Sequence, residues 1–246
     1  MNYFFGSLNE NKTLFFLRRD EWHHCVNVLR LKEGDEVGVL THQGEKGIAR
    51  LLKVHKNECV AEIVQIESVL LPDPKIHIVV SPPKNSERLE WMVEKLSELQ
   101  VSSILFVKSD RCVRKQINIK RLEQIVFSSC KQSINPHPPV LYEPKNLSNL
   151  IQEVVQNKNS LFLLLHCYSS ESKKKLNTEF LQNIQKNKYA RIYSFIGPEG
   201  DWTEYERVEI LNQLNPCIEI DLGTSRLRTE TAAIHIAAVL RILWGV

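Results

Sequence analysis

The pattern of hydrophobic and polar positions divides the chain into two parts. Up to about residue 70, short β-branched and apolar runs alternate with turn residues, which is typical of strands joined by turns. We expect strands at 13–17, 36–40, 48–54 and 60–66, and one short helix at 22–29. Such a series of short strands predicts a small β-barrel or sandwich.

After Pro72 and Pro74, which end regular structure, strands alternate with helices. This alternation predicts an α/β domain with a mostly parallel sheet covered on both faces. The expected domains are 1–70 and 75–246. The helix that follows residue 202 opens with a capping box, Thr203 to Glu206. We expect strands at 76–80, 104–107, 161–165, 192–196 and 217–222, and helices at 86–99, 119–130, 203–214 and 229–243.

Composition and charge exclude several classes of protein. The 43% hydrophobic and 25% charged residues are those of an ordinary globular domain. The apolar run 161–165 is far too short to cross a bilayer, so no membrane partner is expected. The six cysteines include no C-x-x-C pair, which argues against a metal site. With no secretory signal visible at the N-terminus, we expect a cytoplasmic protein with free thiols.

Two glycine-containing loops carry the candidate chemistry. Gly197-Pro198-Glu199-Gly200 follows the strand at 192–196, and Leu222-Gly223 ends the strand at 217–222. Glycine is used where the backbone bends sharply or comes close to a ligand. Each loop by itself could be an ordinary turn before a helix. Together, at the carboxyl ends of two buried strands, they predict a small-molecule crevice.

Basic residues point to a nucleic-acid partner. Between positions 108 and 121, six basic residues stand against a single acid, Asp110, and such a patch fits RNA phosphates. A solvated basic loop is the alternative. The six are Lys108, Arg111, Arg114, Lys115, Lys120 and Arg121. A second RNA-binding face is expected in the first domain, at Arg18, Arg19, His23, His24, Arg30 and Lys32.

The two loops also give the chain a resemblance to a known family. Ile196-Gly-Pro-Glu-Gly200, followed by Leu222-Gly-x-x-x-Leu-Arg-Thr-Glu-Thr-Ala232, resembles the SPOUT class of S-adenosylmethionine-dependent RNA methyltransferases. Within this class the chain is similar to the ribosomal RNA small subunit methyltransferase E family over essentially its whole length. Further matching stretches are His23-His24, 28–35, 84–95, 109–111 and 131–133. The chain departs from the family pattern at Gln100, Asp201, Trp202 and 224–226.

The resemblance implies a PUA-like RNA-binding barrel joined to a SPOUT domain that contains a trefoil knot. It implies a homodimer that transfers a methyl group from S-adenosylmethionine to N3 of a uridine, U1498 of 16S ribosomal RNA in the small ribosomal subunit. Two alternatives remain open. One is a SPOUT methyltransferase for another ribosomal RNA base or a ribose, and the other is a non-catalytic RNA-binding factor for ribosome assembly.

Residue roles follow from the same resemblance. Because N3 of uracil must lose a proton, a cation beside the pyrimidine oxygens would stabilise the uridine anion. Arg228 is the first candidate for this cation and Arg111 the second, with Glu199 or Glu230 orienting the arginine or removing the proton. A phosphate contact or an ion pair at a helix end is the alternative role for each arginine. Lys84 and Arg88 join Arg111, Arg114 and Lys115 as expected RNA contacts. The expected cofactor residues are Leu165, His166, Ile196, Gly197, Glu199, Gly200, Leu222, Gly223, Leu227, Thr231 and Ala232.

Overall fold

Five strands near the N-terminus close into a barrel, which confirms the β-barrel predicted for this part of the chain. Their order is β1-β2-β5-β4-β3; β1 and β3 run parallel, and the other neighbours are antiparallel. Alternate side chains of each strand point inward, and Phe4, Phe15 and Val39 are among those that fill the interior. The strands are β1 (Tyr3–Leu8), β2 (Leu14–Arg18), β3 (Glu36–Thr41), β4 (Glu45–His55) and β5 (Glu58–Ser68).

A short helical segment follows β2. It begins earlier than predicted, as α1 (Arg19–His23), and continues as one π-helical turn, η1 (His24–Val28). Cys25 is fully buried in the barrel core. The indole Nε1 of Trp22 donates a hydrogen bond to the carbonyl of His55, at 2.9 Å. The segment is therefore anchored on the barrel.

The computed structural model describes residues 1–244, and contacts between Cα atoms divide them into two compact units. The first unit contains Met1–Leu71 and also Phe127–Pro138, whereas the sequence prediction placed this second segment with the α/β domain. The reason lies in its packing. The ring of Phe127 lies 5.4 Å from that of Phe5, and His137 Nε2 is 2.7 Å from the carbonyl oxygen of Val69.

The second unit is built on a seven-stranded sheet in the order β10-β12-β9-β11-β6-β7-β8. Every neighbouring pair is parallel, which confirms the predicted α/β architecture. The helix α3 (Ile119–Ser133) begins in this unit, and from Phe127 on it belongs to the first. The other elements of the second unit are β6 (Lys75–Val80), α2 (Ser86–Glu98), β7 (Ser103–Lys108), β8 (Val140–Asn146), α4 (Leu147–Val154), β9 (Ser160–Leu165), β10 (Lys174–Lys175), α5 (Thr178–Lys186), β11 (Arg191–Ile196), α6 (Glu204–Gln213), β12 (Cys217–Asp221) and α7 (Thr229–Leu243).

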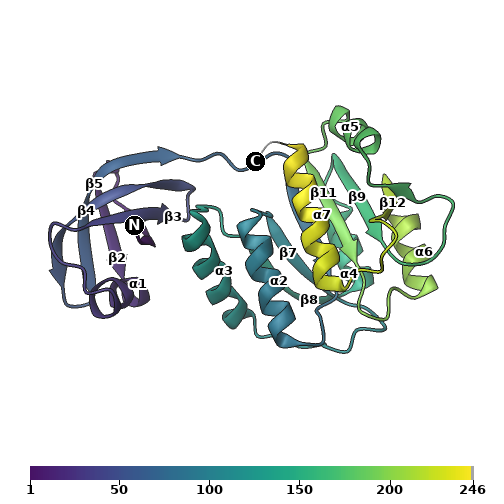
Figure 1. Cartoon of the computed structure of the whole chain (residues 1–246), viewed down its shortest axis with the longest axis horizontal. Coiled ribbons are helices and arrows are strands. Elements are labelled where there is room, and N and C mark those ends of the chain that lie inside the picture. Colours follow the sequence, from purple (N-terminus) through teal and green to yellow (C-terminus); the bar gives the residue numbers. More distant parts are fainter. Residues whose placement is uncertain (245–246) are drawn as a thin grey trace. The chain divides into compact units, whose positions relative to one another are not determined.

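Helices cover the sheet on both faces. Figure 1 shows α2 and α7 together in front of it, and α7 contacts β6 and β11. The helices α4 and α6 contact each other and bury a separate core that includes Val79, Leu164 and Phe195. All six residues of β9 are buried, as expected for a strand covered on both sides. In the described part of the chain, no helix has the length and apolar character needed to span a membrane.

Candidate functional site

A pocket of about 360 Å³ lies where β9, β11 and β12 end. These strands are neighbours and parallel, so the loops that leave their carboxyl ends meet at one edge of the sheet. All of the expected cofactor residues line the pocket except Gly200 and Thr231. A Cβ on Gly200 would lie 3.3 Å from Arg111 Cβ, so this glycine permits close packing of Arg111 instead. Thr231 lies exposed on α7.

Asp201 and Trp202, two of the residues that depart from the family pattern, hold the loop after β11 in place. Trp202 is fully buried, and its Nε1 donates to the carbonyl of Leu165 at 3.2 Å. Asp201 has φ of +63°, a conformation that aspartate tolerates better than most residues. Its carboxylate accepts hydrogen bonds from the backbone N–H of Cys167 at 2.7 Å and of Trp202 at 2.8 Å. Asp201 therefore ties the loop after β11 to the loop after β9.

The helix after this loop begins with the predicted capping box. Glu206 Oε2 accepts from the backbone N–H of Thr203 at 2.8 Å, and Thr203 Oγ1 accepts from the N–H of Glu206 at 3.3 Å. Glu206 Oε1 also accepts from the N–H of Asp110 at 2.8 Å. The cap thus joins the start of α6 to the loop that follows β7.

The loop after β12 turns at Gly223, where φ is +126°. A side chain at this position would be strained, although a Cβ would meet no atom within 4 Å. At the start of α7, the hydroxyl of Thr229 donates to the carbonyl of Gly197 at 2.9 Å. The guanidinium of Arg226 donates to the carbonyl of Glu199 at 3.3 Å. These two bonds join the loop after β12 to the loop after β11.

A buried carboxylate, Glu219 of β12, lies beside the loop after β9. Its oxygens accept hydrogen bonds from His166 Nε2 at 2.8 Å, from Arg207 Nη1 at 3.0 Å and from Ser170 Oγ at 3.1 Å, and also from the hydroxyl of Ser172. Burial alone would raise the pKa of Glu219, but these hydrogen bonds lower it to about 2. Burial lowers the pKa of His166, and its Nε2 faces the Glu219 carboxylate, which can only accept a hydrogen bond.

Sequence reasoning missed Glu219. It stands inside an otherwise apolar strand pattern, and three of its four partners precede it by 47 to 53 residues. A charged residue within a buried strand, Cys217–Asp221, was the available signal, because such a charge requires partners.

The two candidate catalytic arginines have different surroundings. Arg111 Nη1 donates to the carbonyl of Gly200 at 2.9 Å and to the hydroxyl of Tyr168 at 3.0 Å, with the carbonyl of Trp202 at 3.4 Å. Arg228 lines the pocket as the N-cap residue of α7. Within residues 1–244, its guanidinium forms no hydrogen bond or ion pair. Arg111 therefore holds the loop, and Arg228 is available to a bound molecule.

The two candidate acids also differ. Glu199 lines the pocket, and its Oε1 accepts from the backbone N–H of Lys84 at 3.0 Å. Glu230 is buried outside the pocket lining, and its Oε1 lies 3.6 Å from Nε of Arg88. The geometry thus brings Glu199 and Arg228 to one pocket and places Glu230 with Arg88 beside it.

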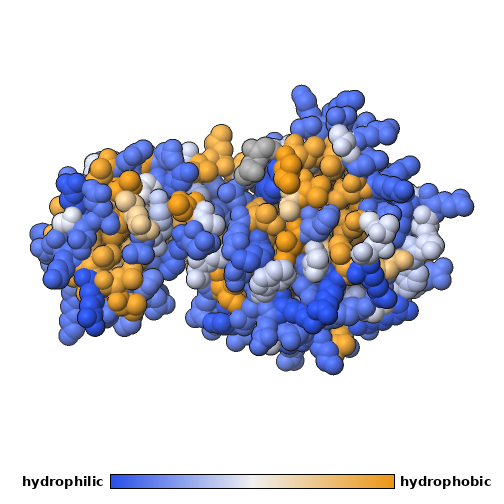
Figure 2. All heavy atoms as spheres, in the orientation of Figure 1, coloured by the Kyte–Doolittle hydropathy of each residue, from blue (hydrophilic) through white to orange (hydrophobic). Residues whose placement is uncertain are grey.

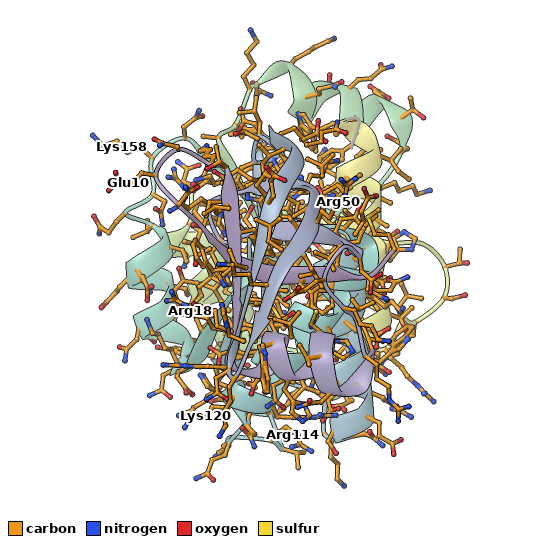
Figure 3. The ribbon with its side chains drawn as sticks, turned by 90° about the vertical axis from the view of Figure 1, so that its left-hand side faces the viewer. Glu10, Arg18, Arg50, Arg114, Lys120 and Lys158 are labelled. Carbon is orange, nitrogen blue, oxygen red and sulfur yellow. The ribbon has the colours of Figure 1, made fainter. Side chains whose placement is uncertain are left out.

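The basic residues of the second unit are partly engaged in the fold. Arg114 donates to the carbonyls of Pro83 and Lys84, at 3.1 and 2.6 Å, and Arg121 pairs with Glu90 at 3.0 Å. Arg114 and Lys120 are labelled in Figure 3; Lys120 is exposed, and Arg114 is half-buried. The exposed basic residues of this unit include Lys84, Lys108, Lys115 and Lys120.

In the barrel, the predicted RNA-binding residues are exposed except for His24, which is half-buried against Phe4. Arg18, labelled in Figure 3, pairs with Glu58 at 2.6 Å while most of its side chain stays exposed. Among the residues that the structure describes, no group of three or more histidine, cysteine, aspartate or glutamate side chains could hold a metal ion.

Two family models match this chain. The RNA methyltransferase domain matches residues 71–241, and the RNA methyltransferase PUA domain matches residues 17–64. The first match spans most of the chain, and the chain therefore belongs to the RNA methyltransferase family. The second match lies within the five-stranded barrel.

The similarity to individual proteins extends over the full length. The ribosomal RNA small subunit methyltransferase E of Aquifex aeolicus is 29% identical, with 96% of this chain and 97% of that protein covered. The protein of the same name from Bacillus subtilis is 26% identical, with 92% and 89% covered. A crystal structure of this enzyme from Neisseria gonorrhoeae, bound to S-adenosyl methionine, has a TM-score of 0.82 at 26% identity and covers 99% of this chain and 98% of its own. These matches confirm the resemblance found in the sequence.

The hydrogen bonds of Arg111 lead to a test of its structural role. We expect Arg111→Ala to accelerate amide hydrogen exchange in peptides covering 197–203 and 166–170, because one guanidinium holds both segments. Arg114→Ala is the matched control, and it should accelerate exchange only near its own acceptors at 82–86. Unchanged exchange at 197–203 in Arg111→Ala would show that the loop does not need this arginine.

Proposed function

We propose that this protein methylates N3 of a uridine in 16S ribosomal RNA of the small ribosomal subunit, with S-adenosylmethionine as methyl donor. U1498 is the position that the family resemblance implies. The observation that carries the proposal is the pocket formed by the loops that leave β9, β11 and β12. The similarity to the Neisseria gonorrhoeae enzyme with its bound S-adenosyl methionine supports the same cofactor here.

The pocket residues fit this cofactor. Leu165, Ile196, Leu222 and Leu227 offer apolar surface for an adenine ring, and Gly223 leaves the backbone open on its side. The volume of about 360 Å³ lies within the usual range for small-molecule sites. When bound, S-adenosylmethionine supplies an electrophilic methyl group on a sulfonium. The loops hold the ligand in a fixed orientation, and in methyl transfer this positioning is most of the catalytic task.

Arg228 and Glu199 are the residues we assign to the acceptor. A guanidinium next to a pyrimidine oxygen stabilises the anion that forms when N3 loses its proton. Glu199 lines the same pocket, so it is placed to orient Arg228 or to accept that proton. Glu230 is paired with Arg88, and we assign it a supporting role at the start of α7.

We assign RNA binding to exposed basic residues in each unit. In the barrel these are the predicted Arg18, Arg19, His23, Arg30 and Lys32, and the match to the PUA model includes all of them. In the second unit, Lys84 and Lys115 are exposed, whereas Arg114 is partly used by backbone carbonyls. Since the substrate is ribosomal RNA, we place the protein in the cytoplasm.

Two other functions compete with this proposal. A SPOUT methyltransferase for another base or a ribose would use the same pocket, so only the product distinguishes it. A non-catalytic assembly factor would need neither an open pocket nor an unpaired arginine at its wall. This protein has such a pocket, and the unpaired Arg228 lies at its wall, which favours an enzyme.

The substrate can be tested by mapping ribosomal RNA from cells that lack this protein. We expect 3-methyluridine to be absent from 16S ribosomal RNA and to return when the wild-type gene is supplied, but not with Arg228→Ala. Mass spectrometry of nuclease fragments measures this. Retention of 3-methyluridine, with loss of a different methyl group, would support the alternative SPOUT substrate.

The role of Arg228 can be tested separately from cofactor binding. We expect Arg228→Ala to lower the single-turnover methylation rate by about 100-fold or more, the usual cost of removing one group that stabilises a developing anion. Its Kd for S-adenosylmethionine, measured by calorimetry, should stay within about twofold of wild type. Arg191→Ala, at the opposite end of β11, is the control and should keep the rate. A rate within tenfold of wild type in Arg228→Ala would exclude this role.

The resemblance also implies a trefoil knot and a homodimer, and we include both in the proposal. The outward face of α7 supports the dimer. Figure 2 shows apolar surface over this helix, and Ile242 is 78% exposed, with Ile234, Ala238 and Val239 partly exposed on the same helix. Exposed apolar patches of this kind mark protein interfaces.

The dimer predicts the effect of a charge on this face. We expect Ile242→Glu to convert a dimer into a monomer, because a carboxylate would be buried without a partner. Sedimentation equilibrium measures the mass. Val208→Glu on α6, where the side chain is 42% exposed, is the control and should leave the dimer intact. A monomeric wild-type protein would contradict the proposed assembly.

A further inference from the structure

One wall of the pocket is an irregular segment whose conformation needs support. Residues 166–173 connect β9 to β10 and contain no helix or strand. His166, Cys167 and Lys173, from the two ends of this segment, line the pocket. A segment without regular structure loses conformational entropy when it is ordered. Side-chain and backbone contacts must therefore hold this wall in place.

Glu219 binds this segment at three points along its length. Its Oε1 accepts from His166 at the start, and its Oε2 accepts from Ser170 in the middle and from Ser172 near the end. The carboxylate is only 6% exposed, so water does not compete for these bonds. One side chain of the rigid sheet thus fixes most of the connection.

Arg207 of α6 completes the arrangement. Its Nη1 lies 3.0 Å from Glu219 Oε1, which balances a charge that would be costly to bury alone. Its guanidinium carbon also lies 5.9 Å from the ring centre of Tyr168, within cation–π distance. Arg207 therefore holds the segment both through Glu219 and directly.

The other contacts of the segment lie at its two ends and at Tyr168, whose hydroxyl donates to the carbonyl of Trp202 at 2.8 Å and accepts from Arg111. Lys173 Nζ donates to the carbonyl of His166 at 2.5 Å, and the N–H of Cys167 donates to Asp201. Glu219 itself is absent from the residues that line the pocket. Its side chain therefore reaches the pocket wall through the hydrogen bonds to the segment 166–173.

We propose that Glu219 is a positioning residue, which orders the segment 166–173 before the cofactor arrives and so sets cofactor affinity. This inference rests on the proposed function only for the identity of the ligand. A wall that is ordered beforehand lowers the entropy cost of binding. Glu219 takes no part in methyl transfer, so its removal weakens binding of S-adenosylmethionine and of its demethylated product S-adenosylhomocysteine alike.

The test uses Glu219→Gln, with Ser172→Ala as a milder variant that keeps the buried charge and its main partners. We expect amide exchange of 166–173 in the ligand-free protein to rise about tenfold in Glu219→Gln and less in Ser172→Ala, whereas exchange in β6 stays unchanged. By calorimetry, the Kd of both ligands should rise about tenfold in Glu219→Gln, the usual size of a lost hydrogen bond to a charged group. The single-turnover rate at saturating S-adenosylmethionine should stay within about threefold of wild type.

Glu45→Gln is the matched control, because Glu45 is a buried, ion-paired acid in the barrel. It should change neither the exchange of 166–173 nor either Kd. Unchanged exchange of 166–173 in Glu219→Gln, or a Kd within twofold of wild type for both ligands, would overturn the proposal. If the wild-type protein binds neither ligand, the proposed cofactor is wrong. The exchange measurement still decides whether Glu219 orders the segment.

Discussion

The whole site depends on the register of three neighbouring parallel strands. Leu165, the last residue of β9, pairs with Ile196 at the end of β11 and with Ile220 near the end of β12. Because the strands end at the same level, their three outgoing loops enclose a single pocket. The register is itself fixed by burial, since the side chains of β9 are packed on both faces of the sheet.

Side-chain hydrogen bonds then convert three separate loops into one structure. The loop after β11 is tied to β9 through Trp202 and Asp201, and the start of α7 is tied to it through Thr229. The bonds from Trp202 and Thr229 each satisfy a buried backbone carbonyl, which would be costly to leave without a partner. The same groups that stabilise the fold therefore also set the shape of the pocket, and Glu219 does this for the segment after β9.

Much of the fold could be predicted from the sequence. The central strands are continuous apolar runs, and the few glycines mark the loops that follow two of them. The pocket could be predicted from Gly197 and Gly223, because loops that follow parallel strands lie together at the carboxyl edge of the sheet. Among the missed elements, α4 has a regular pattern of buried residues, Leu147, Leu150, Ile151 and Val154, and could have been found. Two others carry weaker patterns. The edge strand β8 holds Pro144 and is mostly exposed, and α5 buries one residue, Ile184. The division at 127–138 depends on contacts with Phe5 and Val69, distant in sequence, which local patterns do not report.

Residue type alone could not separate the roles of the charged residues. Arg111 and Arg228 carry the same guanidinium, and both follow strands of the sheet. The guanidinium of Arg111 is used by carbonyls at 200 and 202, whereas that of Arg228 faces the pocket with no partner in residues 1–244. A guanidinium already bound to backbone carbonyls has few donors left for a substrate, whereas the unpaired guanidinium of Arg228 at the pocket wall keeps all of its donors for an anion. Geometry therefore divides one chemical type into a structural residue and a candidate catalytic one.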